Sequence, residues 1–196
     1  MLSNKNKFNI VVCASGGGGN FQVLVDHEKE NNYIISLLIV DRHCGAITRA
    51  IENKINHTVI DKKSDEDDFF MAIDNKIPKD TDLIVLAGFM PILTPVLCQK
   101  WKNKIINTHP SLLPKYGGKG MYGVKVQEAV MANKEKYAGC TIHYVNEGID
   151  EGEIILQKKI KVENDETPWE LGGRIFKEEG ILLVKAINIL KGDISV

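Results

Sequence analysis

The sequence predicts an α/β fold: a Rossmann-like wound, mostly parallel sheet with helices on both faces, C-terminal strands that extend the same sheet, and a long C-terminal helix. Three observations predict it. Short apolar runs rich in β-branched residues recur through the first half, as is typical of strands buried on both faces. Segments with helical character alternate with these runs, which favours βαβ units with right-handed crossovers. A glycine-rich stretch, residues 16–19, separates the first apolar run from the first helical segment.

The first half contains the alternating elements. Asn20 is expected to cap the first helix, and Thr94 the last, with Pro95 in its first turn. The expected strands are 8–14, 33–40, 57–60 and 82–89, and the expected helices are 21–30, 46–53, 65–76 and 94–101.

The second half begins with an apolar pair, Ile105 and Ile106, that leads into a proline-bracketed loop, so residues 104–114 are expected to be a strand that breaks into a loop. A helix at 124–132 and strands at 137–145 and 154–162 follow. Thr167 and Glu170 form a capping-box pattern with Pro168 at the first helical position, which predicts a helix to about residue 190.

Composition indicates one domain that binds small molecules. The chain has 196 residues, expected to form a single domain 1–196 with a nucleotide- or phosphate-binding half at about 8–102 and a catalytic half at about 103–196. A formal net charge of −1 gives no basic footprint for nucleic acid. The four cysteines include no Cys-x-x-Cys pair, so no metal site is expected, and the polar N-terminus with one short apolar run predicts neither a signal peptide nor a membrane span. We expect a cytoplasmic protein, monomeric or homodimeric.

The glycine-rich stretch at a strand–helix junction is a phosphate-binding arrangement. Glycines let the backbone approach an anion, and the free N–H groups and dipole of the helix N-terminus face it. Tight packing of strand against helix is the alternative explanation. No Gly-Lys-Ser/Thr follows, which excludes a Walker loop. A dinucleotide site with Asp41 on the ribose remains a weaker alternative, because Phe21 stands where the third glycine of that motif is required.

Asn107 and His109 are two residues apart, so in an extended chain their side chains leave the same face of the strand. A carboxamide and an imidazole can both donate hydrogen bonds to an oxyanion, and the imidazole can also move a proton, which indicates acyl transfer. The alternative is an asparagine that turns the chain and a histidine bonded to a backbone carbonyl. In such sheets ligands bind beyond the carboxyl ends of the strands, where the glycine stretch, residues 88–90 and this pair are all expected.

Residues 107–114, Asn-Thr-His-Pro-Ser-Leu-Leu-Pro, together with Asp150-Glu151-Gly152, resemble the folate-dependent formyltransferases. Residues 115–123, Lys-Tyr-Gly-Gly-Lys-Gly-Met-Tyr-Gly, are similar to the branch that acts on glycinamide ribonucleotide in purine synthesis. The resemblance implies transfer of a formyl group from the co-substrate 10-formyltetrahydrofolate to the ribonucleotide amine, with no metal. It implies that Asn107 and His109 hold the oxyanion and that Asp150 stabilises the charged imidazole and assists removal of the amine proton.

The same resemblance implies two sets of binding residues. Those for the ribonucleotide are Gly18, Gly19, Asn20, Met121 and Glu179, with Lys115 on the same side. Those for the folate are Phe89, Met90, Ile92, Leu93, Asn107, Asn146, Glu147 and Asp150. For Glu179, a surface glutamate without a ligand is the alternative.

The sequence departs from the family pattern at two places. Gly19 replaces a serine, which removes one hydroxyl donor to the phosphate, and Pro91 replaces an arginine, which leaves the folate tail to Lys62 or Lys63. Two alternative functions stay open: a 10-formyltetrahydrofolate hydrolase, and a Rossmann-type nucleotide-binding protein without formyl transfer.

Overall fold

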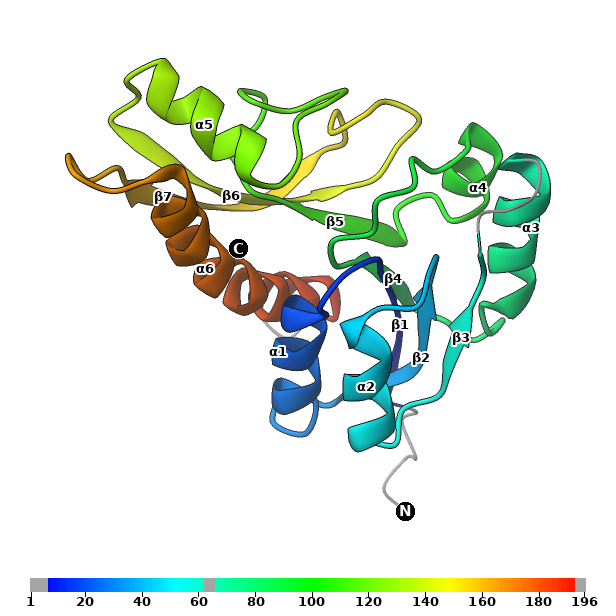
Figure 1. Ribbon diagram of the computed structural model, residues 1–196. Helices are drawn as coiled ribbons and strands as arrows, with labels where there is room; N and C mark the ends of the chain where they lie inside the picture. Colours follow the sequence, from blue (N-terminus) through cyan, green and yellow to red (C-terminus); the bar gives the residue numbers. More distant parts are fainter. Residues whose placement is uncertain (1–6, 62–65, 193–196) are drawn as a thin grey trace. The chain divides into compact units, whose positions relative to one another are not determined.

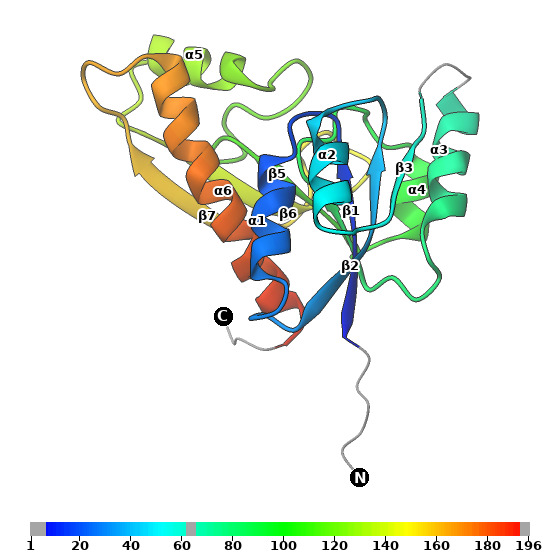
Figure 2. The ribbon, with the colours of Figure 1, turned by 60° about the horizontal axis from the view of Figure 1, so that its bottom comes forward.

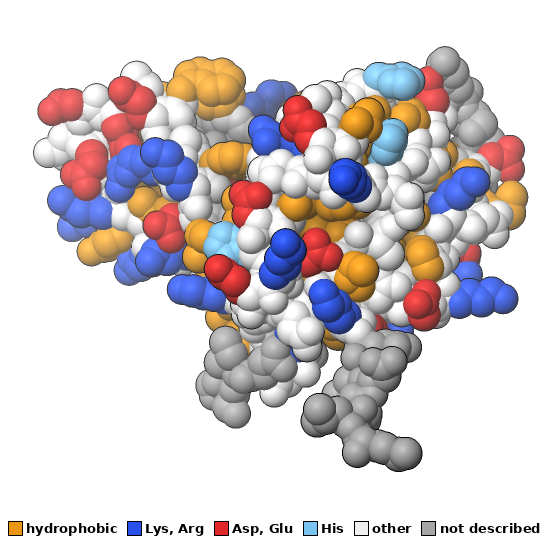
Figure 3. All heavy atoms as spheres, turned by 90° about the horizontal axis from the view of Figure 1, so that it is seen from below, with side chains coloured by type: hydrophobic (Ala, Val, Ile, Leu, Met, Phe, Trp, Pro, Cys, Tyr) orange, Lys and Arg blue, Asp and Glu red, His pale blue; other side chains and the backbone are white. Residues whose placement is uncertain are grey.

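The computed structural model describes residues 7–61 and 66–192. The chain divides into two compact units, Met1–Leu97 and Cys98–Val196, and helix α4 (Pro95–Lys100) crosses the division. In the described part of the chain, none of the helices is long and apolar enough to cross a membrane. Acidic and basic side chains are interspersed on the face shown in Figure 3.

The N-terminal unit is a wound α/β unit. Its strands are β1 (Phe8–Ala14), β2 (Tyr33–Val40), β3 (His57–Val59) and β4 (Leu83–Leu86), and they pair in parallel in the order β3-β2-β1-β4. Its helices are α1 (Gly19–His27), α2 (Gly45–Glu52) and α3 (Glu66–Lys76). Figure 1 shows α1 and α2 on one side of these strands and α3 on the other, as right-handed crossovers require.

The C-terminal unit is built on antiparallel strands. β5 (Ile105–His109) pairs with β6 (Tyr137–Tyr144), and β6 pairs with β7 (Ile154–Lys161). Helix α5 is Val124–Ala132, and the long helix α6 is Pro168–Leu190. Helix α6 packs against β6 and β7 and also contacts α5 (Figure 2).

Buried apolar residues form the core of each unit. Strand β1 is buried from Ile10 to Ala14, which matches its almost uninterrupted apolar sequence and its place between β2 and β4. Along α6 the apolar residues that recur at helical spacing, such as Leu171 and Ile175, are fully buried. The predicted α/β fold with a long C-terminal helix is confirmed, and so is the capping box, because Thr167 and Glu170 bond each other's backbone N–H groups.

Three predicted details were wrong, and the first is the end of the first helix, which was expected at residue 30 but is His27. Helix α1 begins at Gly19, and its N-cap is Gly18 at φ 72° without a side-chain bond, so Asn20 does not cap it. The left-handed turn at Gly18 brings the chain tightly against α2 and starts the helix earlier than a capping asparagine would. Strand β4 stops at Leu86 instead of residue 89, because Gly88 turns the chain at φ 73°.

Candidate active site

The polar cluster in the C-terminal unit is built on two neighbouring strands. Asn107 and His109 lie on β5 and face the same side, as predicted from their spacing. The antiparallel register places His143 of β6 directly opposite Asn107, and Thr141 directly opposite His109. Directly opposed residues lie on the same face of a sheet, so the pairing brings a second histidine beside the predicted pair.

His143 holds the amide of Asn107. Its Nδ1 lies 2.8 Å from the Tyr144 carbonyl oxygen, which can only accept, so Nδ1 carries a proton and donates it. In the neutral ring Nε2 is therefore an acceptor, and Asn107 Nδ2 donates to it at 3.2 Å. Burial lowers the pKa of His143 below its ordinary value, against the opposing effects of the Tyr144 bond and Asp150. A neutral His143 thus orients Asn107 and leaves one amide hydrogen of Asn107 available to a ligand.

The ring of His109 is held in one tautomer. Its Nε2 lies 2.8 Å from the Tyr116 carbonyl oxygen, which accepts a hydrogen bond, so the Nε2 proton is committed there. Its Nδ1 lies 3.4 Å from Asp150 Oδ2. With the ring neutral, Nδ1 carries a lone pair, so it is the nitrogen free to take up a proton, and the Asp150 carboxylate at this distance would stabilise that proton.

Asp150 is placed by the loop between β6 and β7. Its backbone is left-handed at φ 59°, and its Oδ2 accepts a hydrogen bond from the Gly118 N–H at 3.0 Å. Its Oδ1 lies 3.7 Å from His143 Nε2. The carboxylate is only 12% exposed, so its charge acts on the imidazoles with little screening by water. Asn107, His109 and Asp150, predicted to act together, are gathered in one cluster.

A buried hydroxyl fixes the loop that follows His109. Thr141 Oγ1 donates to the Ser111 carbonyl at 2.6 Å and accepts from Leu113 N at 3.1 Å and from Gln157 Nε2 at 2.9 Å. The Thr141 side chain is fully buried. Three hydrogen bonds on one oxygen therefore tie the loop to β6 and β7 next to the cluster.

The glycine stretch of the N-terminal unit presents free backbone donors. In the part of the chain that the structure describes, the N–H groups of Gly17, Gly18 and Gly19 make no hydrogen bond, and Gly16 and Gly17 are exposed. Arg49 of α2 donates from Nε to the Gly17 carbonyl at 2.7 Å, and no carboxylate pairs with Arg49 among the described residues. Three free N–H groups at a helix N-terminus, beside a guanidinium whose charge is not neutralised by a described carboxylate, suit a phosphate.

The segment after β4 lies beside the glycine stretch. The sequence predicted this, because both segments follow the carboxyl ends of parallel strands. Ser15 N donates to the Gly88 carbonyl at 3.1 Å, and Ser15 Oγ accepts from Met90 N at 2.8 Å. Met90 and Ile92 are exposed by 50% and 54%, whereas Phe89 and Leu93 are buried. Two of the four apolar side chains predicted to bind folate are therefore directly available to the flat face of a ligand.

The other predicted binding residues have distinct surroundings. Asn146 accepts a hydrogen bond from Gly148 N at 3.0 Å, and Glu147 accepts one from Gln99 Nε2 of α4 at 2.7 Å, so the β6–β7 loop is held both from within and by α4. Glu179 of α6 is 6% exposed, which contradicts the surface alternative. Burial raises the pKa of the Cys140 thiol to about 12, and the negative charge of Glu179 adds to this effect.

Met121 follows the glycine-rich turn of the C-terminal unit, and its N–H donates to the Gly118 carbonyl at 3.1 Å. Lys115 pairs with Glu135 at 2.7 Å instead of standing free. Lys62 and Lys63, the candidates for the folate tail, lie outside the described residues.

Sequence reasoning missed three groups: His143, the Tyr116 carbonyl and Arg49. The β5–β6 register that pairs His143 with Asn107 has no local signal in the sequence. The Tyr116 carbonyl has no signal in the sequence either, because every residue has a backbone carbonyl. Arg49 is 32 positions from the glycine it contacts, so only the packing of α2 on the glycine stretch reveals it.

The fold and the cluster are those of an α/β enzyme that has a glycine turn suited to an anion and an Asn–His–Asp constellation suited to acyl transfer. The comparison with protein families agrees, because the formyl transferase model matches residues 8–187. The chain belongs to the formyl transferase family.

Individual relatives agree with this assignment. The chain is 38% identical over 174 residues to the phosphoribosylglycinamide formyltransferase of Bacillus subtilis (strain 168), covering 86% of this chain and 87% of that protein. It is 34% identical over 190 residues to the chloroplastic phosphoribosylglycinamide formyltransferase of Arabidopsis thaliana, covering 92% of this chain and 64% of that protein. It spans only 14% of the trifunctional purine biosynthetic protein adenosine-3 of Chironomus tentans, at 35% identity.

A solved structure shows the same fold. Glycinamide ribonucleotide transformylase 1 from Symbiobacterium toebii superposes with a TM-score of 0.88 at 30% identity, over 97% of this chain and 91% of that one. The formyltetrahydrofolate deformylase of Pseudomonas syringae pv. tomato reaches a TM-score of 0.86 at 23% identity, which shows a common fold alone.

Proposed function

We propose that this chain transfers the formyl group of 10-formyltetrahydrofolate to the amine of glycinamide ribonucleotide, giving formylglycinamide ribonucleotide and tetrahydrofolate. The observation that carries the proposal is the cluster of Asn107, His109 and Asp150 in a chain of the formyl transferase family. The names of the Bacillus and Symbiobacterium relatives support the choice of acceptor.

In the proposed reaction the substrate amine attacks the formyl carbon, a new C–N bond forms, and the carbonyl oxygen becomes an oxyanion. The free amide hydrogen of Asn107 is suited to donate to that oxygen. His109 Nδ1 is suited to take up the amine proton while Asp150, 3.4 Å away, stabilises the resulting cation. The C–N bond to tetrahydrofolate then breaks, and the departing nitrogen receives the proton.

Phosphate binding is proposed for the glycine stretch. Gly19 carries no hydroxyl, but the free N–H groups of Gly17, Gly18 and Gly19 supply donors from the backbone. The guanidinium of Arg49, which bonds the Gly17 carbonyl, adds positive charge at the same turn. This arrangement supports retention of the phosphate site despite the missing serine.

Folate binding is proposed for Met90, Ile92 and the β6–β7 loop. The two exposed apolar side chains suit one face of a pterin ring. The loop from Asn146 to Asp150 is held by one hydrogen bond of its own and by bonds from Gln99 and Gly118, so its remaining backbone groups are in fixed positions to recognise polar ring edges. For the ribonucleotide, Glu179 and Met121 are proposed contacts.

The proposed reaction takes place in the cytoplasm. All four cysteines are free, which suits a reducing compartment.

The test is a spectrophotometric assay of purified protein with a 10-formyl folate, run with and without glycinamide ribonucleotide. Deformylation that requires the ribonucleotide is the expected result. Folate turnover without the ribonucleotide would instead identify a hydrolase. Absence of turnover in both arms, with protein that is folded, would contradict the proposed function.

A further inference from the structure

The carbonyl that fixes the His109 tautomer lies in a strained turn. Tyr116 has a left-handed backbone at φ 57°, a conformation that side chains other than glycine rarely adopt. Such a conformation persists only where the surroundings hold it, and it is frequent at functional sites. The Tyr116 carbonyl oxygen is 2.8 Å from His109 Nε2, so the geometry of this turn decides whether that bond is kept.

Two contacts hold the turn, one from each side. On the inner side Ser111, which is fully buried, donates from Oγ to the Lys115 carbonyl at 2.7 Å. On the outer side Glu135, in the connection from α5 to β6, reaches both residues of the turn with one oxygen. Its Oε1 lies 2.7 Å from Lys115 Nζ and 3.1 Å from Tyr116 Oη.

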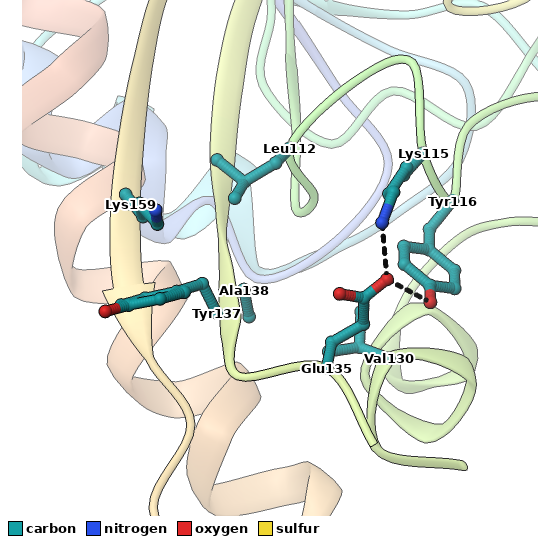
Figure 4. A pocket seen from close by; sticks show the side chains of 8 residues that line it. All are labelled: Leu112, Lys115, Tyr116, Val130, Glu135, Tyr137, Ala138 and Lys159. Atoms are coloured by element: carbon teal, nitrogen blue, oxygen red, sulfur yellow. Dashed lines mark hydrogen bonds and ion pairs between the residues drawn. The ribbon is translucent and has the colours of Figure 1, made fainter. Parts of the chain in front are cut away.

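Figure 4 shows both bonds converging on the Glu135 carboxylate at the edge of a cavity of about 250 Å³. Leu112 and Val130 also line this cavity. The bond to Lys115, and then the bond to Tyr116, lower the pKa of Glu135 below its ordinary value. The carboxylate is therefore ionised at neutral pH, and both contacts are charge-assisted hydrogen bonds.

Glu135 is itself anchored. Its backbone N–H donates to the Val130 carbonyl at 3.2 Å, at the end of α5. The path from this anchor to the catalytic ring is thus short and continuous: the α5 end, the Glu135 carboxylate, the Tyr116 phenol and backbone, and His109 Nε2.

We propose that Glu135 is a positioning residue for His109: by clamping the side chains of Lys115 and Tyr116, it keeps the Tyr116 carbonyl on Nε2 and so leaves Nδ1 as the reactive nitrogen. Glu135 acts through the turn and contacts neither the ring of His109 nor, in this proposal, the substrates. The consequence for turnover rests on the proposed function, whereas the consequence for the ring tautomer does not.

The test compares Glu135→Gln and Tyr116→Phe with a matched control, Glu163→Gln. Glu163 lies in the same unit and forms an exposed ion pair with Lys161 at 3.6 Å. Nitrogen-15 chemical shifts of the His109 ring in labelled protein report which nitrogen carries the proton. We expect the Nε2–H tautomer to dominate in the unmodified protein and in the control, and a mixture of tautomers in the two clamp variants.

The kinetic arm uses the formyl transfer assay. Changes that loosen groups behind a catalytic residue commonly lower activity by a factor of 10 to 100, so we expect kcat to fall about tenfold in Glu135→Gln with KM changed less than about twofold. Tyr116→Phe keeps the ring and serves if the glutamine variant fails to fold. Unchanged His109 shifts in a folded clamp variant would overturn the proposal. If the unmodified protein transferred no formyl group, the proposed function would fail while the tautomer comparison still decided this inference.

Discussion

Replacement of Asp150 by Asn isolates the charge beside His109. Asparagine has nearly the same shape, tolerates the left-handed backbone found here at φ 59°, and can still accept the Gly118 N–H bond. The variant is therefore expected to fold. What it loses is the negative charge 3.4 Å from His109 Nδ1, which in the proposed reaction would stabilise the imidazolium formed when the amine proton is taken up.

The magnitude follows from the distance. Two unit charges 3.4 Å apart interact by about 5 kcal/mol at an effective dielectric constant of about 20. Loss of the whole term would slow the chemical step by more than about 10³-fold, because each 1.4 kcal/mol is a factor of ten. Since the amide dipole of asparagine replaces part of the interaction, we expect kcat to fall by about 10² to 10³-fold, with a small change in KM.

The assay is initial-rate formyl transfer with both substrates saturating, with circular dichroism to establish folding. Asp165→Asn is the control, because Asp165 is exposed in a turn before α6 and lies in the same unit. A folded Asp150→Asn protein whose kcat stays within about threefold of the unmodified enzyme would refute the electrostatic role of Asp150.

Three further perturbations test the surroundings. Thr141→Val leaves the buried Leu113 N–H without its acceptor and the Ser111 carbonyl without its donor, so urea denaturation should show a loss of about 1 to 3 kcal/mol in the free energy of unfolding, whereas Thr141→Ser should lose much less. The pKa of His143 is lower in the folded protein than its ordinary value of 6.5, so at pH values below 6.5 the unfolded chain binds more protons than the folded one. The free energy of unfolding should therefore fall as the pH drops from 6.5 towards the folded-state pKa, by at most about 1.4 kcal/mol per pH unit. His143→Asn should lack this component in denaturation curves between pH 5 and 7. Gly18→Ala, at φ +72 with its Cβ 2.8 Å from the Ala46 Cα, should destabilise the protein by about 1 to 3 kcal/mol in thermal or urea unfolding, whereas Gly16→Ala, with nothing within 4 Å of its Cβ, should not.

The helices and strands could be predicted from the sequence because each is indicated by a short stretch of adjacent residues. The almost uninterrupted apolar run of β1 and the capping box at Thr167 each depend on a few adjacent residues, and both were predicted correctly. The start of α1 was not, because the left-handed turn at Gly18 depends on the packing of Ala46 against it. A capping asparagine and a close-packed glycine look equally plausible in the sequence.

In the candidate site, too, features set by adjacent residues could be predicted, and features set by packing or strand register could not. Asn107 and His109 could be paired from spacing alone, since residues two apart share a strand face. Asp150 required the family resemblance, because no local pattern distinguishes it from other aspartates in turns. His143 escaped prediction because its role arises from strand register, which depends on the whole β5–β6 pairing.

That register matters for the chemistry because two histidines face one carboxylate. Asp150 lies 3.4 Å from His109 Nδ1 and 3.7 Å from His143 Nε2, so a protonated His143 would compete for its charge. His143 is held neutral by burial, and its Nε2 lone pair is occupied by the Asn107 amide. The charge of Asp150 is therefore directed to His109. In the proposed reaction, the bond that orients the Asn107 amide towards the oxyanion is also the bond that occupies His143 Nε2. A variant that lacks the Asn107 amide should therefore disturb both oxyanion stabilisation and proton uptake.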